Sequence, residues 1–327
     1  MDLLSRLLAL MPVTGELEAR CQFGAPWRIQ SAAAAEHEIH YHVLLSGEAL
    51  FEDGNGPPLA MRAGDIVMLP SGALHALHDG SGRKPAGSTT QFVDGLEVVT
   101  NQGRGAPADV LCGRFLLPAM PQQLLRDHLP GRLLVRTSAP ASDEAGGEAP
   151  GTNRLTRLVE LMREESAELG AGSMALVNHL SGALFALTMR FASESGESGE
   201  PPRGLLALAA RPRLQPALTA MFDAPERPWT LPELAELCHM SRATFARHFD
   251  EALGRSASDL LTEIRMTVAG KLLGEGTLSV AEIGERVGYQ SDAAFQRVFK
   301  RQVGVTPAQW RARSRDRGRR AMQDEAA

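Results

Sequence analysis

The sequence predicts an α+β multidomain protein, in which an N-terminal β-barrel is followed by an all-α C-terminal domain. The chain has 327 residues, which corresponds to about two domains of ~150 residues each. In the first third, short runs of alternating apolar and polar residues are separated by Gly, Pro and Asn clusters, a pattern typical of sandwiches and barrels. From residue 154 onward the apolar residues follow helical spacing instead, and one pair of helices occurs twice near the C-terminus.

The composition excludes several classes of protein. Fractions of 43% hydrophobic and 22% charged residues lie close to globular averages, which excludes a disordered or collagen-like chain. No uncharged apolar run reaches the ~18 residues of a membrane helix, and the N-terminus lacks the basic segment of a signal peptide. The three widely spaced cysteines favour reduced thiols over a secreted disulfide framework. We therefore expect a cytoplasmic protein.

Two stretches rich in Gly, Ser, Pro and Glu predict flexible linkers. The predicted order is a β domain at 1–137, a linker at 138–153, a helical region at 154–192, a linker at 193–203, an all-α domain at 204–314 and a basic, then polar, tail at 315–327. Taken whole, the net charge of −5 argues against nucleic acid. However, residues 203–327 hold 19 basic and 15 acidic residues, a net of +4, so the preceding residues carry −9. This asymmetry indicates two different roles.

The most specific pattern of the β domain runs from Gly64 to His75, with the spacing G-x5-P-x-G-x2-H. Upstream lies the triplet His40-Tyr41-His42. Together they resemble the two sequence motifs of the cupins, which implies a jelly-roll barrel.

The same histidines are candidate ligands of a divalent transition metal. On a strand the i, i+2 spacing puts His40 and His42 on one face, and His75 would supply a third imidazole. Glu48 shares their strand parity and would be the carboxylate, although the cupin pattern has it closer to the second histidine. The alternative is that these histidines line a ligand pocket or hydrogen-bond locally.

The region 154–192 predicts two amphipathic helices, separated at Gly170–Gly172. Their apolar faces would either pack on the barrel or pair with the same helices of a second copy. The sequence leaves both alternatives open.

The C-terminal domain contains an internal repeat. Thr230–Phe249 matches Ser279–Phe299, and each copy reads as a short helix, a three-residue turn and a second helix. Thr230 and Ser279 each precede a Glu three residues on, the arrangement of a capping box. Such units, at about 231–251 and 280–302, predict helix-turn-helix motifs, whose second helix enters the major groove of DNA.

The two units, joined by the apolar helix 257–274, strongly resemble the DNA-binding domain of AraC-type (AraC/XylS) transcription regulators. The residues that carry the resemblance are Arg265, Met266, Ala269, Leu272, Leu273, Ile283, Gly284, Val287, Gly288, Tyr289, Ser291, Phe295, Phe299, Lys300, Gly304 and Pro307. It implies a regulator that reads two successive major-groove segments of double-stranded promoter DNA and works with RNA polymerase.

The exposed polar residues of the two recognition helices are then the candidate DNA-binding residues. Arginine suits guanine, glutamine suits adenine, and lysine or serine suits phosphate. The alternative for each is an ordinary solvated helix face, and Arg247 and Arg297 are also candidates for a structural role because each lies two residues before an apolar Phe. The candidates are Ser241, Arg242, Thr244, Arg247, His248, Gln290, Ser291, Asp292, Gln296, Arg297 and Lys300.

The segments 1–8, 21–27 and 111–115, with the cupin motifs, resemble the AraC-type subgroup whose sensor is a cupin, including its reactive-chlorine-responsive activators. In those members oxidation of sensor cysteines raises transcription, which makes Cys21 and Cys112 redox-sensing candidates. Arg20 and Arg114 would favour the thiolates if their side chains turned toward sulfur. A small-molecule effector in the barrel is the competing interpretation.

The sequence therefore predicts a sequence-specific transcription regulator with a cupin sensor, an activator and a homodimer, with no enzymatic activity. The alternative from another class is a metal-dependent cupin enzyme that carries a DNA-binding appendage and uses His40, His42, His75 and Glu48.

Overall fold

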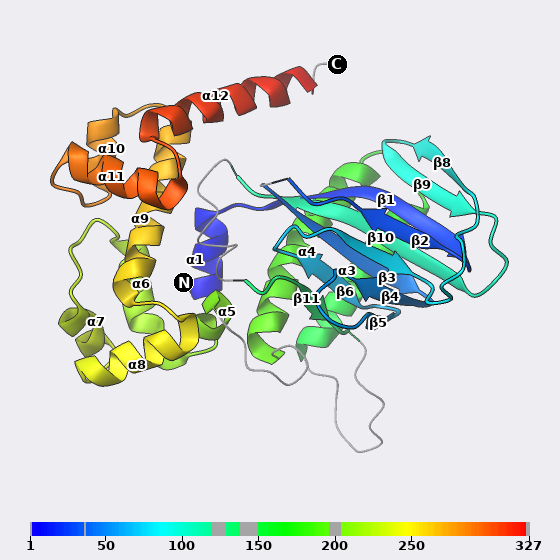
Figure 1. Cartoon of the computed structure of the whole chain (residues 1–327), viewed down its shortest axis with the longest axis horizontal. Coiled ribbons are helices and arrows are strands. Elements are labelled where there is room, and N and C mark those ends of the chain that lie inside the picture. Colours follow the sequence, from blue (N-terminus) through cyan, green and yellow to red (C-terminus); the bar gives the residue numbers. More distant parts are fainter. Residues whose placement is uncertain (1, 36, 119–128, 138–149, 196–203, 325–327) are drawn as a thin grey trace. The chain divides into compact units, whose positions relative to one another are not determined.

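The computed structural model describes residues 2–35, 37–118, 129–137, 150–195 and 204–324 (Figure 1). It divides into two compact units. The barrel unit comprises residues 13–117 and 130–201, and the helical unit comprises residues 1–12, 118–129 and 202–327. Most of the two predicted linkers and the last three residues lie outside the described residues, so the domain boundaries stay predictions.

The barrel unit consists of two sheets. The larger has the order β11-β6-β3-β10-β1-β9-β8, and the smaller has the order β2-β7-β4-β5. Neighbouring strands are antiparallel, except that β1 and β9 are parallel. The strands are β1 (Thr14–Gly24), β2 (Arg28–Ser31), β3 (Glu38–Ser46), β4 (Glu48–Glu52), β5 (Leu59–Arg62), β6 (Ile66–Leu69), β7 (His75–His78), β8 (Ser88–Val93), β9 (Leu96–Asn101), β10 (Pro107–Leu116) and β11 (Leu133–Val135).

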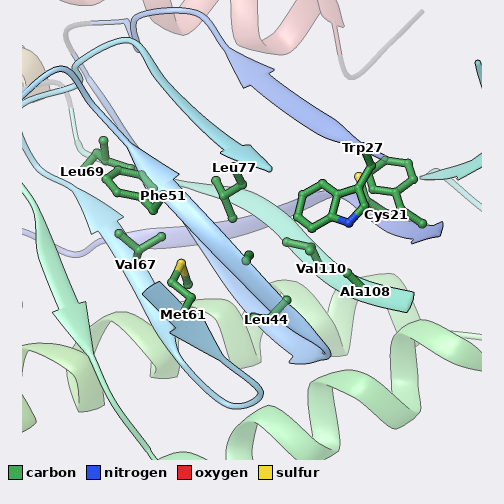
Figure 2. Packing of buried hydrophobic residues seen from close by; sticks show 12 residues of the cluster. Cys21, Trp27, Leu44, Phe51, Met61, Val67, Leu69, Leu77, Ala108 and Val110 are labelled. Atoms are coloured by element: carbon green, nitrogen blue, oxygen red, sulfur yellow. The ribbon is translucent and has the colours of Figure 1, made fainter. Parts of the chain in front are cut away.

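The space between the two sheets is filled with apolar side chains. Figure 2 shows Trp27, Phe51 and Leu77 in this cluster, together with Cys21 and Leu44 from the larger sheet. All five are buried, which removes their apolar surface from water and stabilises the pairing of the sheets by roughly 25 cal/mol per Å² of that surface.

The opposite face of the larger sheet is covered by the helices α3 (Pro150–Ala167) and α4 (Ser173–Ser195). The hydroxyl of Tyr41 on β3 lies 2.8 Å from that of Ser181 on α4, and the ring of Phe115 on β10 packs edge-on against Phe185 at 5.1 Å. A Cβ at Gly15 would come within 2.3 Å of the Ser181 Cβ, so only glycine lets α4 approach β1 this closely. The helices pack on the barrel, the first of the two alternatives that the sequence left open.

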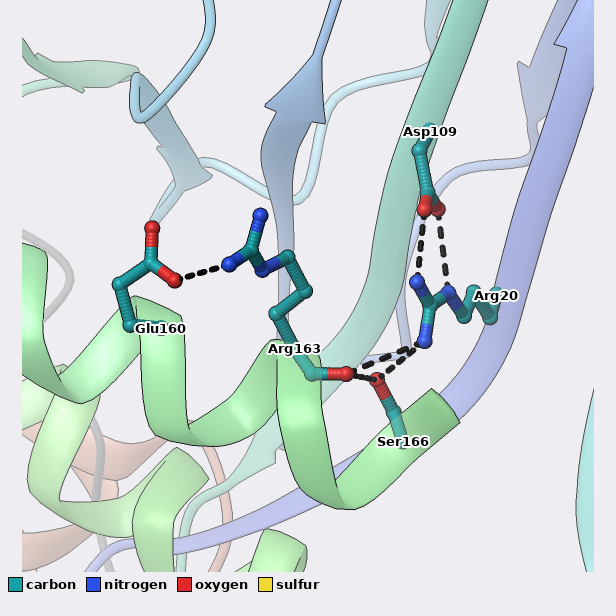
Figure 3. Close-up of polar contacts among 5 residues, drawn as sticks. All are labelled: Arg20, Asp109, Glu160, Arg163 and Ser166. Atoms are coloured by element: carbon teal, nitrogen blue, oxygen red, sulfur yellow. Dashed lines mark hydrogen bonds and ion pairs between the residues drawn. The ribbon is translucent and has the colours of Figure 1, made fainter. Parts of the chain in front are cut away.

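A buried charge joins β1 and β10 to α3 (Figure 3). The guanidinium of Arg20 donates to both carboxylate oxygens of Asp109, at 3.2 and 2.7 Å. Its third nitrogen donates to the Arg163 carbonyl at 3.1 Å and to the Ser166 hydroxyl at 3.2 Å. Arg20 is 6% exposed, and a buried cation requires this degree of hydrogen bonding. Arg20 therefore fixes the end of α3 to the sheet.

The helical unit has a helix before and after each recognition helix. The N-terminal helix α1 packs against α6 and contributes an ion pair between Arg6 and Asp223. The helix α9 connects the two helix-turn-helix motifs. The elements are α1 (Leu3–Leu10), α5 (Gly204–Ala209), the 3-10 helix η1 (Pro212–Leu214), α6 (Gln215–Asp223), α7 (Leu231–Leu237), α8 (Arg242–Leu253), α9 (Ala257–Glu275), α10 (Val280–Arg286), α11 (Asp292–Val303) and α12 (Pro307–Asp324).

Both capping boxes that the sequence predicted are confirmed. Thr230 caps α7 and Ser279 caps α10, and in each the side chain accepts from the backbone N–H of the Glu three residues on. Those glutamates, Glu233 and Glu282, receive hydrogen bonds from the hydroxyl and backbone N–H of the cap residue, which hold their pKa values below the usual range. The two helix-turn-helix units thus begin in the same way.

Candidate DNA interface and barrel thiol cluster

The two recognition helices, α8 and α11, have the same distribution of exposed and buried residues. Residues 241–250 and 291–300 follow one order of exposed, half-buried and buried positions throughout. The buried positions are phenylalanines, Phe245 and Phe249 in α8 and Phe295 and Phe299 in α11. Because the core side of each helix is fixed by its two rings, the opposite side of each is presented to solvent.

The first recognition helix presents two arginines. Arg242 and Arg247 are exposed, and the Nε of Arg247 lies 3.9 Å from the Oε1 of Glu251. Ser241 is the cap of α8, and its hydroxyl accepts from the Thr244 N–H and also hydrogen-bonds to the Thr244 hydroxyl. Both hydroxyls thus have local partners. His248 is half-buried, with its Nδ1 3.5 Å from Glu251.

The second recognition helix has different chemistry on the same surface. Ser291 caps α11 through the Ala294 N–H, and the Gln296 amide donates to Asp292 at 2.8 Å. Gln290, Arg297 and Lys300 are exposed. The sequence reasoning missed Arg301, which is also exposed and follows Lys300 in the last turn. Its helical position next to Arg297 and Lys300 would have been the signal.

The barrel unit brings both candidate cysteines together. Cys21 on β1 pairs in register with Val110, and Cys112 on β10 pairs with Ala19, so the cysteines are diagonal neighbours on adjacent strands. The neighbouring Cys21 thiol, followed by burial, raises the pKa of Cys112 well above its ordinary value. Cys21 is 4% exposed, whereas Cys112 is only half-buried. The third cysteine, Cys238, is buried in the helical unit.

Two of the predicted histidines adjoin the cysteines. The Nδ1 of His42 lies 3.1 Å from the Cys112 Sγ, and its Nε2 lies 2.7 Å from the Nε2 of His75. The Nδ1 of His75 lies 2.9 Å from the carbonyl oxygen of Ala73. Burial lowers the pKa of both imidazoles, so the two rings are neutral near pH 7.

The predicted metal ligands do not fit a metal. Glu48 is exposed, because Gly47, with φ +85°, turns the chain between β3 and β4 and the strand parity starts anew after it. The two Nε2 atoms that a metal would take are hydrogen-bonded to each other, and His40 contacts His75 only ring to ring, at 5.6 Å between centroids. Within the described part of the chain, no group of three or more His, Cys, Asp or Glu is arranged to hold a metal ion.

The two arginines expected to activate the thiols turn elsewhere. Arg20 binds Asp109 and α3, and Arg114 binds Glu16 at 2.9 Å and forms ion pairs with two further glutamates. Successive side chains of a strand point to opposite faces, so Arg20 cannot share a face with Cys21. The expectation that these arginines face sulfur is therefore wrong, and the neighbour of Cys112 is His42 instead.

Comparison with known proteins defines the class. Residues 2–194 match the family model described as cupin, and residues 234–313 match the model described as helix-turn-helix domain. The chain belongs to the AraC-type transcription regulators that carry an N-terminal cupin domain. It is a DNA-binding transcription regulator, and the interpretation as a cupin enzyme is not favoured.

Several relatives extend over nearly the whole chain. One is RclR of Escherichia coli K12, described as an RCS-specific HTH-type transcriptional activator, with 29% identity over 96% of this chain and 99% of its own. An uncharacterized HTH-type transcriptional regulator of Haemophilus influenzae is 30% identical over 95% of this chain and 98% of its own. The regulator MtrA of Neisseria gonorrhoeae is 29% identical over 95% and 98%. Among the described helices of this chain, none is long and apolar enough to cross a membrane.

Proposed function

We propose that this regulator is a cytoplasmic, non-enzymatic activator that senses a two-electron oxidant by joining Cys21 to Cys112. The observation that carries this proposal is the strand register, which makes Cys21 and Cys112 diagonal neighbours in the barrel cluster. The half-buried Cys112 gives an oxidant access to the pair. The name of the Escherichia coli relative, RCS-specific activator, agrees with it.

The strand geometry supports a link between oxidation and DNA binding. Diagonal neighbours on adjacent antiparallel strands have Cα atoms about 7–8 Å apart, whereas a disulfide needs roughly 4.4–6.8 Å. Closing the bond would therefore move β1 relative to β10. The strand β1 begins at Thr14, directly after α1, and α1 packs in the helical unit against α6. The displaced strand is thus covalently joined to a helix of the DNA-binding unit.

On the DNA side, we propose that Arg242 and Arg247 of α8 and Gln290, Arg297 and Lys300 of α11 contact bases or phosphates. Ser241 and Ser291 cap the two recognition helices, the Thr244 hydroxyl hydrogen-bonds to Ser241, and Asp292 orients Gln296. The proposal includes contact with RNA polymerase and a homodimer, since Leu161 and Leu176 expose apolar side chains on α3 and α4. Sedimentation of the full chain measures the oligomeric state.

The test is promoter output in cells with and without hypochlorous acid, comparing the wild type with Cys21→Ser and Cys112→Ser. We expect the response to disappear in both variants and to persist in Cys238→Ser, the matched control in the helical unit. A full response in Cys21→Ser would contradict the redox proposal. In that case a small-molecule effector in the barrel becomes the better interpretation.

A further inference from the structure

The hydrogen bonds that begin at Cys112 have a single possible direction. The carbonyl oxygen of Ala73 can only accept, so the Nδ1 of His75, 2.9 Å away, carries the hydrogen. A neutral imidazole has one N–H, which leaves the Nε2 of His75 as an acceptor. The Nε2 of His42, 2.7 Å away, must then be the donor.

The same rule fixes the other side of His42. Because its single hydrogen is on Nε2, its Nδ1 has a free lone pair and lies 3.1 Å from the Cys112 Sγ. The thiol is therefore a donor to His42 Nδ1. His42 and His75 are 3% and 1% exposed, so both imidazoles are held in the barrel interior beside the half-buried Cys112.

We propose that His42 is the base that removes the proton of Cys112 when its sulfur attacks an oxidant, with His75 as the positioning residue that fixes the His42 tautomer. The proposal rests on the proposed redox function. A nucleophile, a base within hydrogen-bond reach and a third group that orients the base form the recurring arrangement of an activated nucleophile.

With hydrogen peroxide as the oxidant, every atom and proton of the step is accounted for. The Cys112 sulfur attacks the nearer peroxide oxygen and the O–O bond breaks. The thiol proton passes through His42 Nδ1 to the departing hydroxide, which leaves as water, and Cys112 becomes a sulfenic acid. The sulfur of Cys21 then attacks that of Cys112, the S–O bond breaks, and the hydroxide takes the Cys21 proton to form a second water and the disulfide.

Cys112 needs a base because its thiol is protonated at rest. The neighbouring Cys21 thiol and burial raise its pKa well above the ordinary value, so little thiolate is present before the oxidant arrives. The resting site is therefore quiet, and its reaction rate depends on the proton acceptor. General bases of this kind contribute about 10²–10⁴-fold to a rate.

The experiment uses the full-length, reduced, chelator-treated protein and two probes, hydrogen peroxide and iodoacetamide. Mass spectrometry follows the modification of Cys112, with Cys238 of the same sample as the internal reference. For His42→Gln we expect both rates at Cys112 to fall about 10²-fold, the lower bound for a lost base. His75→Gln should give a smaller loss, and His40→Gln, on the same face of β3 but outside this hydrogen-bond chain, should match the wild type.

A purely structural role predicts the opposite sign. Loosening the barrel would speed the alkylation of Cys21 and Cys112 together, whereas loss of a base slows Cys112 alone. An unchanged or faster rate of Cys112 modification in a folded His42→Gln variant would overturn the proposal. Iodoacetamide tests the base without any oxidant. Slower alkylation of Cys112 in this variant therefore supports the base even if promoter output does not respond to oxidant. The missing promoter response would overturn the proposed function alone.

Discussion

The two helix-turn-helix units share a core and differ on the surface. Both begin with a capping box and bury two phenylalanines of the recognition helix. The helix α8, however, carries two arginines balanced by Asp250 and Glu251, whereas α11 carries three cations against one acid. The first turn holds Arg242 in α8 and Asp292 in α11. The same core thus carries two different surfaces, and we propose that the first unit reads bases and the second holds phosphates.

The largest expected effect is at Arg242. If α8 reads bases, Arg242→Ala should weaken binding to the specific promoter by about 1–3 kcal/mol while leaving random DNA nearly unchanged. Fluorescence anisotropy with both DNAs measures the difference. Arg213→Ala, an exposed arginine of the helical unit outside both motifs, is the matched control for loss of one charge. Equal losses of affinity for promoter and random DNA would show that Arg242 contacts phosphate. The two units would then not differ in what they contact.

The next effect concerns what the units share. Thr230→Ala and Ser279→Ala each remove a cap hydroxyl, and each should lower the stability of its helix by about 1 kcal/mol. Hydrogen exchange of the α7 and α10 amides in the full chain measures the two losses separately. Because the folded pKa of Glu233 and Glu282 is lowered from 4.5, the contribution of these glutamates is complete above that pH and fades as pH falls through the folded value. A loss of stability in only one of the two helices would show that the two capping boxes do not contribute equally.

Sequence reasoning succeeded where the determinants are local. The capping boxes, the helix boundaries and the paired phenylalanines each depend on residues within two or three turns, so spacing alone reveals them. It also placed His42 in the barrel, because strand parity is reliable within one strand, and His75, through the spacing of the cupin-like motif. Glu48 was misplaced because Gly47 ends that strand, and parity does not survive a turn.

The thiol cluster was beyond local reasoning. The approach of Cys21 to Cys112 depends on the register of β1 against β10, strands separated by about ninety residues of chain, for which spacing gives no information. The direction of the hydrogen bonds depends further on the Ala73 carbonyl, a backbone atom without any sequence signature. Arg20 was read as a neighbour of sulfur from adjacency in sequence, although adjacent strand residues face opposite ways.

The smallest effect tests the second unit as the holder of phosphates. Lys300→Ala should weaken binding to specific and random DNA by the same factor. It should also reduce the slope of log affinity against log salt by about one, because one fewer counterion is released. Titrations at several salt concentrations give the slope. In α8 the equivalent position is Asp250, so Asp250→Ala, the matched change of opposite charge, should leave the slope unchanged or steepen it. A loss at Lys300 confined to the promoter would instead make α11 a reader of bases, and the two units would then share their role as well as their fold.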